Sequence, residues 1–116
     1  TVMAWAHLAI IETMEGGHDA LVLARTAVGL APRSHFCHYV LGRALMSARR
    51  WAEAVVELAV AVELGGAQTA NALYRIGLAS EQDGNQAAAR SAWTALMRLQ
   101  PEHSGARQGL RRLEPR

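Results

Sequence analysis

Residues 69–103 read TANALYRIGLASEQDGNQAAARSAWTALMRLQPEH and carry a pattern that recurs along the chain. Ala89 in this stretch is preceded by Ala54 and Ala20, at steps of 35 and 34 residues. The same phase is kept by three residues at unit ends: Pro32, Gly66 and Pro101. A period of this length is typical of stacked supersecondary units, each too small to bury its own apolar face. The sequence therefore predicts a repeat protein.

Each unit is predicted to hold two helices joined by a short turn. In residues 69–103, apolar residues at helical spacing occur both before and after Gly84. Glycine commonly follows the last turn of a helix, and Asn85 is a good N-terminal cap for the next helix. Gly16–Gly17 is expected to end a helix in the same way, and Ser34 to cap one. Aromatic residues make up only 5% of the chain, which favours close-packed helices over a β-sandwich.

We therefore predict an all-α domain over residues 1–116, with repeats at about 1–34, 35–68 and 69–103 and a capping helix at about 104–114. The capping helix would turn apolar residues inward and four arginines outward: Arg107, Arg111, Arg112 and Arg116. A polar outer face is what the end of a repeat stack requires. Because the chain starts with threonine and not with methionine, we expect a fragment of a longer protein, so an upstream signal or anchor and the compartment stay open.

Small residues at fixed positions have a steric reason, because two helices approach closely only where one of them lacks a bulky side chain. Gly42 and Gly77 in the first helices are expected to face alanines of the second helices. Ala54 and Ala89 should be buried where helices cross. Trp93 is the large apolar side chain of the last repeat.

This pattern resembles the tetratricopeptide-repeat (TPR) family, whose signature is a Leu-Gly pair, an aromatic residue, a turn glycine, two alanines flanking an aromatic residue or leucine, and a proline. The middle repeat matches through Leu41-Gly42, Leu45, Ala54, Leu58 and Ala61. The last repeat matches through Ile76-Gly77, Gly84, Ala89, Trp93 and Pro101. The first repeat keeps Ala20, Ala27 and Pro32. Four positions depart from the signature: Leu8, Arg49 at the turn glycine, Gly66 at the proline and Leu96.

The resemblance implies a right-handed superhelix in which the first helix of each pair lines a concave groove that holds a peptide or helix of a partner. One known mode in this family clamps the C-terminal carboxylate of chaperones with two lysines, two asparagines and an arginine. The matching positions here are Trp5, Ala9, Val40, Asn71 and Arg75. Only the arginine agrees, so we reject that mode.

Projection of the inner faces of the three first helices places four of the six aromatic residues on one surface. The predicted groove residues are Trp5, Phe36, Tyr39, Arg43, Met46, Asn71, Tyr74, Arg75 and Leu78. Accessible aromatic rings would anchor an apolar segment, and the two arginines would orient its acidic or carbonyl groups. The alternative is that the rings pack on neighbouring repeats or on a missing N-terminal helix.

Other chemistry finds little support in the sequence. On a helix, His35 and Cys37 would point away from each other, whereas His35 and His38 could share a face. Two ligands do not make a structural zinc site, so we expect no metal site, with Cys37 and His38 in the core and His35 in the loop. We expect no cofactor and no catalytic arrangement of side chains. A net charge of +2 gives no basic footprint for nucleic acid, and no apolar run approaches the ~20 residues of a membrane span.

The sequence thus predicts a protein-interaction scaffold that binds a protein or peptide, in a bacterial assembly, secretion or maturation complex. All twelve basic residues are arginines, which indicates a GC-rich bacterium. Two alternatives stay open: an accessory domain of a larger enzyme or regulator, and a scaffold that assembles with copies of itself through the groove.

Overall fold

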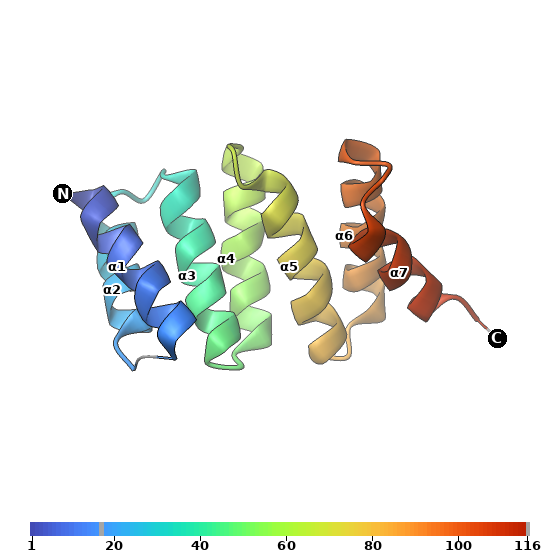
Figure 1. Ribbon diagram of the computed structural model, residues 1–116, viewed down its shortest axis with the longest axis horizontal. Helices are drawn as coiled ribbons and strands as arrows, with labels where there is room; N and C mark the ends of the chain where they lie inside the picture. Colours follow the sequence, from blue (N-terminus) through green and yellow to red (C-terminus); the bar gives the residue numbers. More distant parts are fainter. Residues whose placement is uncertain (17, 116) are drawn as a thin grey trace.

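Seven helices form the computed structural model, which describes residues 1–16 and 18–115 (Figure 1). Their bounds are α1 Val2–Glu15, α2 Ala20–Leu30, α3 His35–Ser47, α4 Trp51–Leu64, α5 Thr69–Gln82, α6 Gln86–Leu99 and α7 Ser104–Leu113. No strand occurs in the two described ranges, and the molecule measures 48 × 25 × 20 Å. The predicted all-α class is confirmed. None of these helices has the length and apolarity needed to cross a bilayer.

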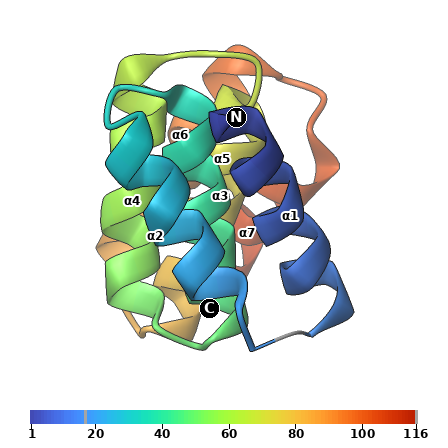
Figure 2. The same ribbon diagram turned by 90° about the vertical axis from the view of Figure 1, so that its left-hand side faces the viewer.

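The helices form two layers along the long axis of the molecule. Helices α1, α3, α5 and α7 lie on one side, and α2, α4 and α6 lie on the other (Figures 1 and 2). Each helix packs on its successor, while α1 also contacts α3, and α5 also contacts both α3 and α7. The chain is therefore a helical solenoid of three helix pairs closed by a final helix.

Three turns use the left-handed backbone region at corresponding places. The first helix of each pair is followed by Gly16 (φ 72°), Arg49 (φ 62°) and Gly84 (φ 77°). Glycine reaches this region at no steric cost, whereas a side chain strains it. The sequence signature correctly located the turn at Arg49 although its glycine is absent. Gly17, the second residue of the predicted Gly16–Gly17 helix end, lies outside the described residues.

Side-chain caps occur at four helix starts, the first of them at Thr1, whose hydroxyl accepts a hydrogen bond from the Ala4 amide. The Ser34 hydroxyl accepts a hydrogen bond from the Cys37 amide at 3.2 Å, and the Asn85 side chain accepts one from the Ala88 amide at 3.0 Å. Both caps were predicted. The final helix starts at Ser104, as expected, but its cap is the imidazole of the preceding histidine.

Glycines make room for the largest side chains of the core. The Trp93 ring is fully buried between α5 and α7, and a Cβ added to Gly77 or Gly109 would collide with it. A Cβ at Gly42 would collide with Leu58 in the same way. The expectation that Gly42 and Gly77 face alanines is therefore wrong. Each faces the largest fully buried side chain of the paired helix, which can pack closely only where the facing residue has no side chain.

Alanine dominates where the helices cross. Ala54 and Ala89 have no exposed surface, which confirms their expected burial, and the corresponding Ala20 is 6% exposed. The first helix pair relies on alanines alone for its fully buried residues: Ala6, Ala9, Ala24 and Ala27. The largest fully buried side chains all belong to α3 through α6. The apolar core is therefore richest in the second and third pairs.

Candidate partner-binding surface

The nine predicted groove residues come from three helices of one layer. Trp5 belongs to α1, four residues belong to α3, and four belong to α5. Helix α3 contacts both α1 and α5, so the nine predicted groove residues lie on adjacent helices. Their side chains differ in how much surface they expose.

Tyr39 is a core residue. Its side chain is 4% exposed and belongs to the apolar cluster that contains Leu58 and Trp93. Its hydroxyl accepts a hydrogen bond from Nε of Arg75 at 3.3 Å. The ring therefore offers no surface to a partner, contrary to the expectation, because α5 packs over it.

Two further aromatic rings are half-buried against other rings. The Phe36 ring lies 5.5 Å from the His7 ring of α1. The Tyr74 ring lies 5.6 Å from the ring of Trp93 and 5.3 Å from that of His103. Phe36 thus packs on a neighbouring repeat, as the alternative held, whereas Tyr74 packs on residues of its own repeat. Both residues keep partial exposure.

The remaining apolar and amide groups of the set are accessible. Trp5 is 39% exposed, while Met46 and Leu78 are half-buried. Asn71 is exposed and donates a hydrogen bond to the Gln68 side chain at 2.7 Å. Together with Phe36, Arg43, Tyr74 and Arg75, these residues form what we call the inner-helix surface.

Two arginines of this surface lie beside one another. The Arg43 guanidinium carbon lies 5.9 Å from the Tyr39 ring centroid, and Arg75 bonds to the hydroxyl of the same ring. Burial, and next the positive charge of Arg75, lower the pKa of Arg43. Nε of Arg43 is buried without a hydrogen-bond partner among the described residues. The sequence pattern indicated that both arginines lie on one face, but it contained no sign that both contact the same tyrosine.

The three residues considered as metal ligands have structural roles. Nδ1 of His35 lies 2.7 Å from the Ala61 carbonyl oxygen, and Nε2 accepts a hydrogen bond from the Gln68 amide at 2.9 Å. His35 is thus the first residue of α3, and its ring connects α3 to α4 and to the α4–α5 connection. The expectation that His35 lies in the loop is therefore wrong. Cys37 is buried, as predicted. No cluster of three metal-ligating residues occurs in residues 1–16 and 18–115.

His38 is buried and links three segments. One ring nitrogen lies 2.8 Å from the Glu57 carboxylate of α4, and the other lies 2.6 Å from the Pro32 carbonyl oxygen. The expected core position of His38 is confirmed.

The capping helix is tied to the repeats by arginines. Arg112 pairs with Glu81 of α5 at 2.8 Å. Arg90 of α6 donates a hydrogen bond to the Leu113 carbonyl at 3.0 Å. Arg107 and Arg111 are exposed, as predicted, and Arg116 lies outside the described residues.

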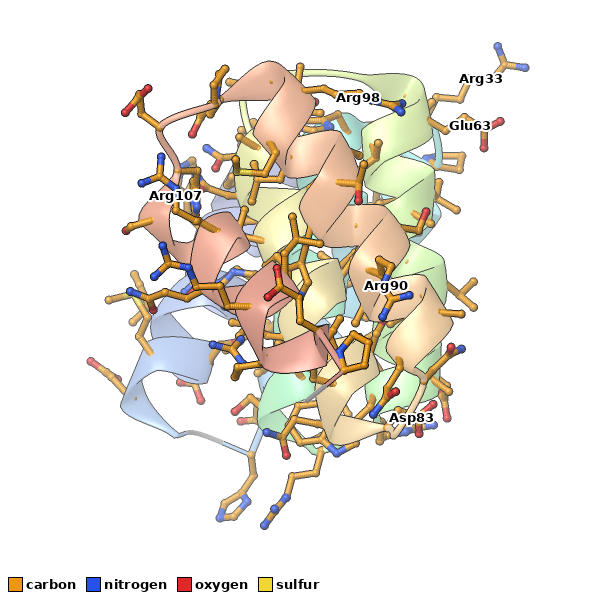
Figure 3. All side chains as sticks on the ribbon, turned by 90° about the vertical axis from the view of Figure 1, so that its right-hand side faces the viewer. Arg33, Glu63, Asp83, Arg90, Arg98 and Arg107 are labelled. Atoms are coloured by element: carbon orange, nitrogen blue, oxygen red, sulfur yellow. The ribbon has the colours of Figure 1, made fainter. Side chains whose placement is uncertain are left out.

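Two cavities of about 310 Å³ occur in the described part of the chain, and neither is lined by a predicted groove residue. One lies beside the α1–α2 connection. The other is an apolar cleft between α4 and α6, lined by Ala59, Val62, Leu73, Ile76, Ala88, Ser91, Ala92 and Ala95. Figure 3 shows Glu63 of α4 and Arg98 of α6 near the same end of these two helices.

The outer side of α1 lacks the cover that the equivalent sides of α3 and α5 possess. In α5 this side is buried through Leu73, Ile76, Gly77 and Ser80. Three of the four equivalent residues of α1 are apolar and exposed: Ala4, Leu8 and Ile11. Leu8 and Ile11 are 49% and 47% exposed, so this side of α1 is apolar and accessible.

The fold is that of tetratricopeptide-repeat domains. The first TPR domain of the human RPAP3 protein matches with a TM-score of 0.84 at 18% sequence identity, over 97% of this chain and 88% of that chain. The N-terminal domain of stress-induced protein-1 from C. elegans matches with a TM-score of 0.82 at 18% identity, over 98% of this chain and 94% of that chain. No protein-family model and no curated protein sequence matches this chain. The predicted TPR fold is confirmed.

Proposed function

We propose that this chain is a protein-interaction scaffold that binds a peptide or helix of a partner on the inner-helix surface. The observation that carries the proposal is that eight of the nine predicted groove residues keep exposed surface on three adjacent helices, with Tyr39 as the exception. Accessible apolar side chains that lie next to charged groups without an ion-pair partner in the described part of the chain, here Arg43 and Arg75, are typical of contact surfaces. No catalytic role is proposed.

The surface divides into apolar and charged parts. Trp5, Phe36, Met46 and Leu78 would contact apolar side chains of the partner. The arginine-only basic composition supports a bacterial source. Within such a source, we propose a role in an assembly, secretion or maturation complex. An accessory role beside an enzyme or regulator in the same polypeptide would use the same surface.

The test is a selection from a displayed library of random dodecapeptides on the purified, immobilised chain. Peptides enriched on the native chain are then synthesised, and their affinities are measured for Trp5→Ala and Leu78→Ala. Truncating a true anchor should weaken binding by about tenfold or more. Val56→Ala is the matched control, because Val56 is 61% exposed on α4, outside the inner-helix surface.

The proposal fails if no peptide is enriched, or if both variants bind the enriched peptides as tightly as the native chain. Circular dichroism of each variant checks that helix content is unchanged. A loss of binding in the Val56→Ala control would place the contact on the other layer of helices and would also overturn the proposal.

A further inference from the structure

Arg43 and Arg75 differ from every other arginine that the structure describes. All the others are exposed, whereas these two are half-buried. The arginine ion pairs among residues 1–16 and 18–115 involve Arg25, Arg50, Arg107 and Arg112. The two least exposed guanidiniums are therefore the two that lie together, and neither has a carboxylate partner.

Such an arrangement is unfavourable for the free chain. Burial removes water from a charged group, and a second positive charge nearby adds repulsion. The lowered pKa of Arg43 has these two causes, and its buried Nε lacks an acceptor. The Tyr39 hydroxyl accepts from Arg75 but cannot neutralise either charge. An anion placed between the two guanidiniums would offset both the cost of burying the charge and the repulsion between the two arginines.

We propose that Arg43 and Arg75 together bind the carboxylate of an aspartate or glutamate side chain in the partner segment, with Tyr39 holding Arg75 in position. Planar guanidinium groups match a carboxylate through paired N–H···O hydrogen bonds. The neighbouring residues of the surface are apolar or neutral, including Phe36, Met46 and Leu78, so a single acidic side chain flanked by apolar ones fits better than a polyanion. The inference rests on the proposed function of the inner-helix surface.

The test repeats the peptide selection on Arg43→Gln and Arg75→Gln. Peptides enriched on the native chain should contain an aspartate or glutamate beside apolar residues, and those enriched on the two variants should keep the apolar residues but lose the acidic one. Arg90→Gln and Arg98→Gln on α6 are the matched controls, and both should retain the acidic preference.

The best native-selected peptide is then synthesised with blocked ends and compared with its Asp→Asn or Glu→Gln version. The acidic form should bind the native chain at least about tenfold more tightly, and Arg43→Gln should reduce that ratio to near unity. Inorganic phosphate and a free-C-terminus peptide serve as competing sources of an oxyanion.

Three results would overturn the inference. One is the enrichment of apolar peptides that contain no acidic residue. That result would contradict the carboxylate site but would still support the proposed function of the inner-helix surface. Another is an affinity that depends on a free C-terminus and not on the internal side chain. The third is displacement of the peptide by phosphate at the same strength as by the acidic peptide. If no peptide is enriched at all, the proposed function itself fails, and this inference fails with it.

Discussion

Arg49 occupies a position where the backbone has φ 62°, while the corresponding turns of the other two repeats use Gly16 and Gly84. A side chain in this region costs about 1 kcal/mol relative to glycine. Arg49→Gly should therefore raise the free energy of unfolding by about that amount, measured by urea denaturation. Arg50→Gly is the control, because Arg50 has φ −95° and should lose stability. Equal or lower stability of Arg49→Gly would show that the turn is not strained.

Arg43 allows a test of charge within the free chain. The folded state disfavours its charged form through burial and through Arg75, which lowers its pKa. Arg43→Met keeps most of the apolar length and removes the charge. We expect a higher melting temperature than for the native chain, with weaker binding of the acidic peptide. Arg33→Met, at an exposed position, should leave the melting temperature unchanged. A clear fall in the melting temperature of Arg43→Met would mean that Arg43 stabilises the fold.

At the scale of the helices, the sequence predicted the elements well and their contacts less well. Caps and turn residues act locally, so Ser34, Asn85 and Gly84 located helix ends from the sequence alone. The burial of Tyr39 depends on how closely α5 approaches α3, and a single-helix projection contains no such distance. Likewise, repeat phase located Gly77 but did not reveal that it faces Trp93, because the pattern gives positions and not side-chain directions.

The crossings between paired helices give a prediction for Ala54 and Ala89. Both are fully buried, so extra methylene groups have no space. Ala54→Leu and Ala89→Leu should each lower the free energy of unfolding by roughly 1–3 kcal/mol, measured by chemical denaturation. Ala52→Leu is the control, because Ala52 is exposed on the same helix as Ala54. Unchanged stability in both buried variants would contradict the packing described for these helix pairs.

Over the whole molecule, the two terminal helices of the solenoid differ in how well they are packed against the rest of the chain. Helix α7 is held by the Arg112–Glu81 ion pair and by the contact of Gly109 with Trp93. Helix α1 has an apolar outer side without cover, and the first pair buries only alanines completely. In repeat stacks, each pair depends on its neighbours for stability, so the less well-packed end opens first.

Hydrogen exchange measures this difference directly. We expect the amides of α1 and α2 to exchange fastest among the helices, α5 and α6 to be the most protected, and α7 to be intermediate. Arg112→Gln should increase exchange in α7 and leave α1 unchanged. Protection of α1 equal to that of α5, or faster exchange in α7 than in α1, would show that the two terminal helices are not packed as described.

The enclosure of Trp93 by two glycines also gives the molecule an optical reporter at one end. An indole without contact with water emits at shorter wavelength and is shielded from dissolved quenchers such as acrylamide. Trp93 meets this condition, whereas Trp5 and Trp51 keep exposed surface in the first and second repeats. Quenching should therefore leave a blue-shifted emission from Trp93 alone. Its red shift during denaturation would mark the moment when the third repeat opens, separately from the loss of the first.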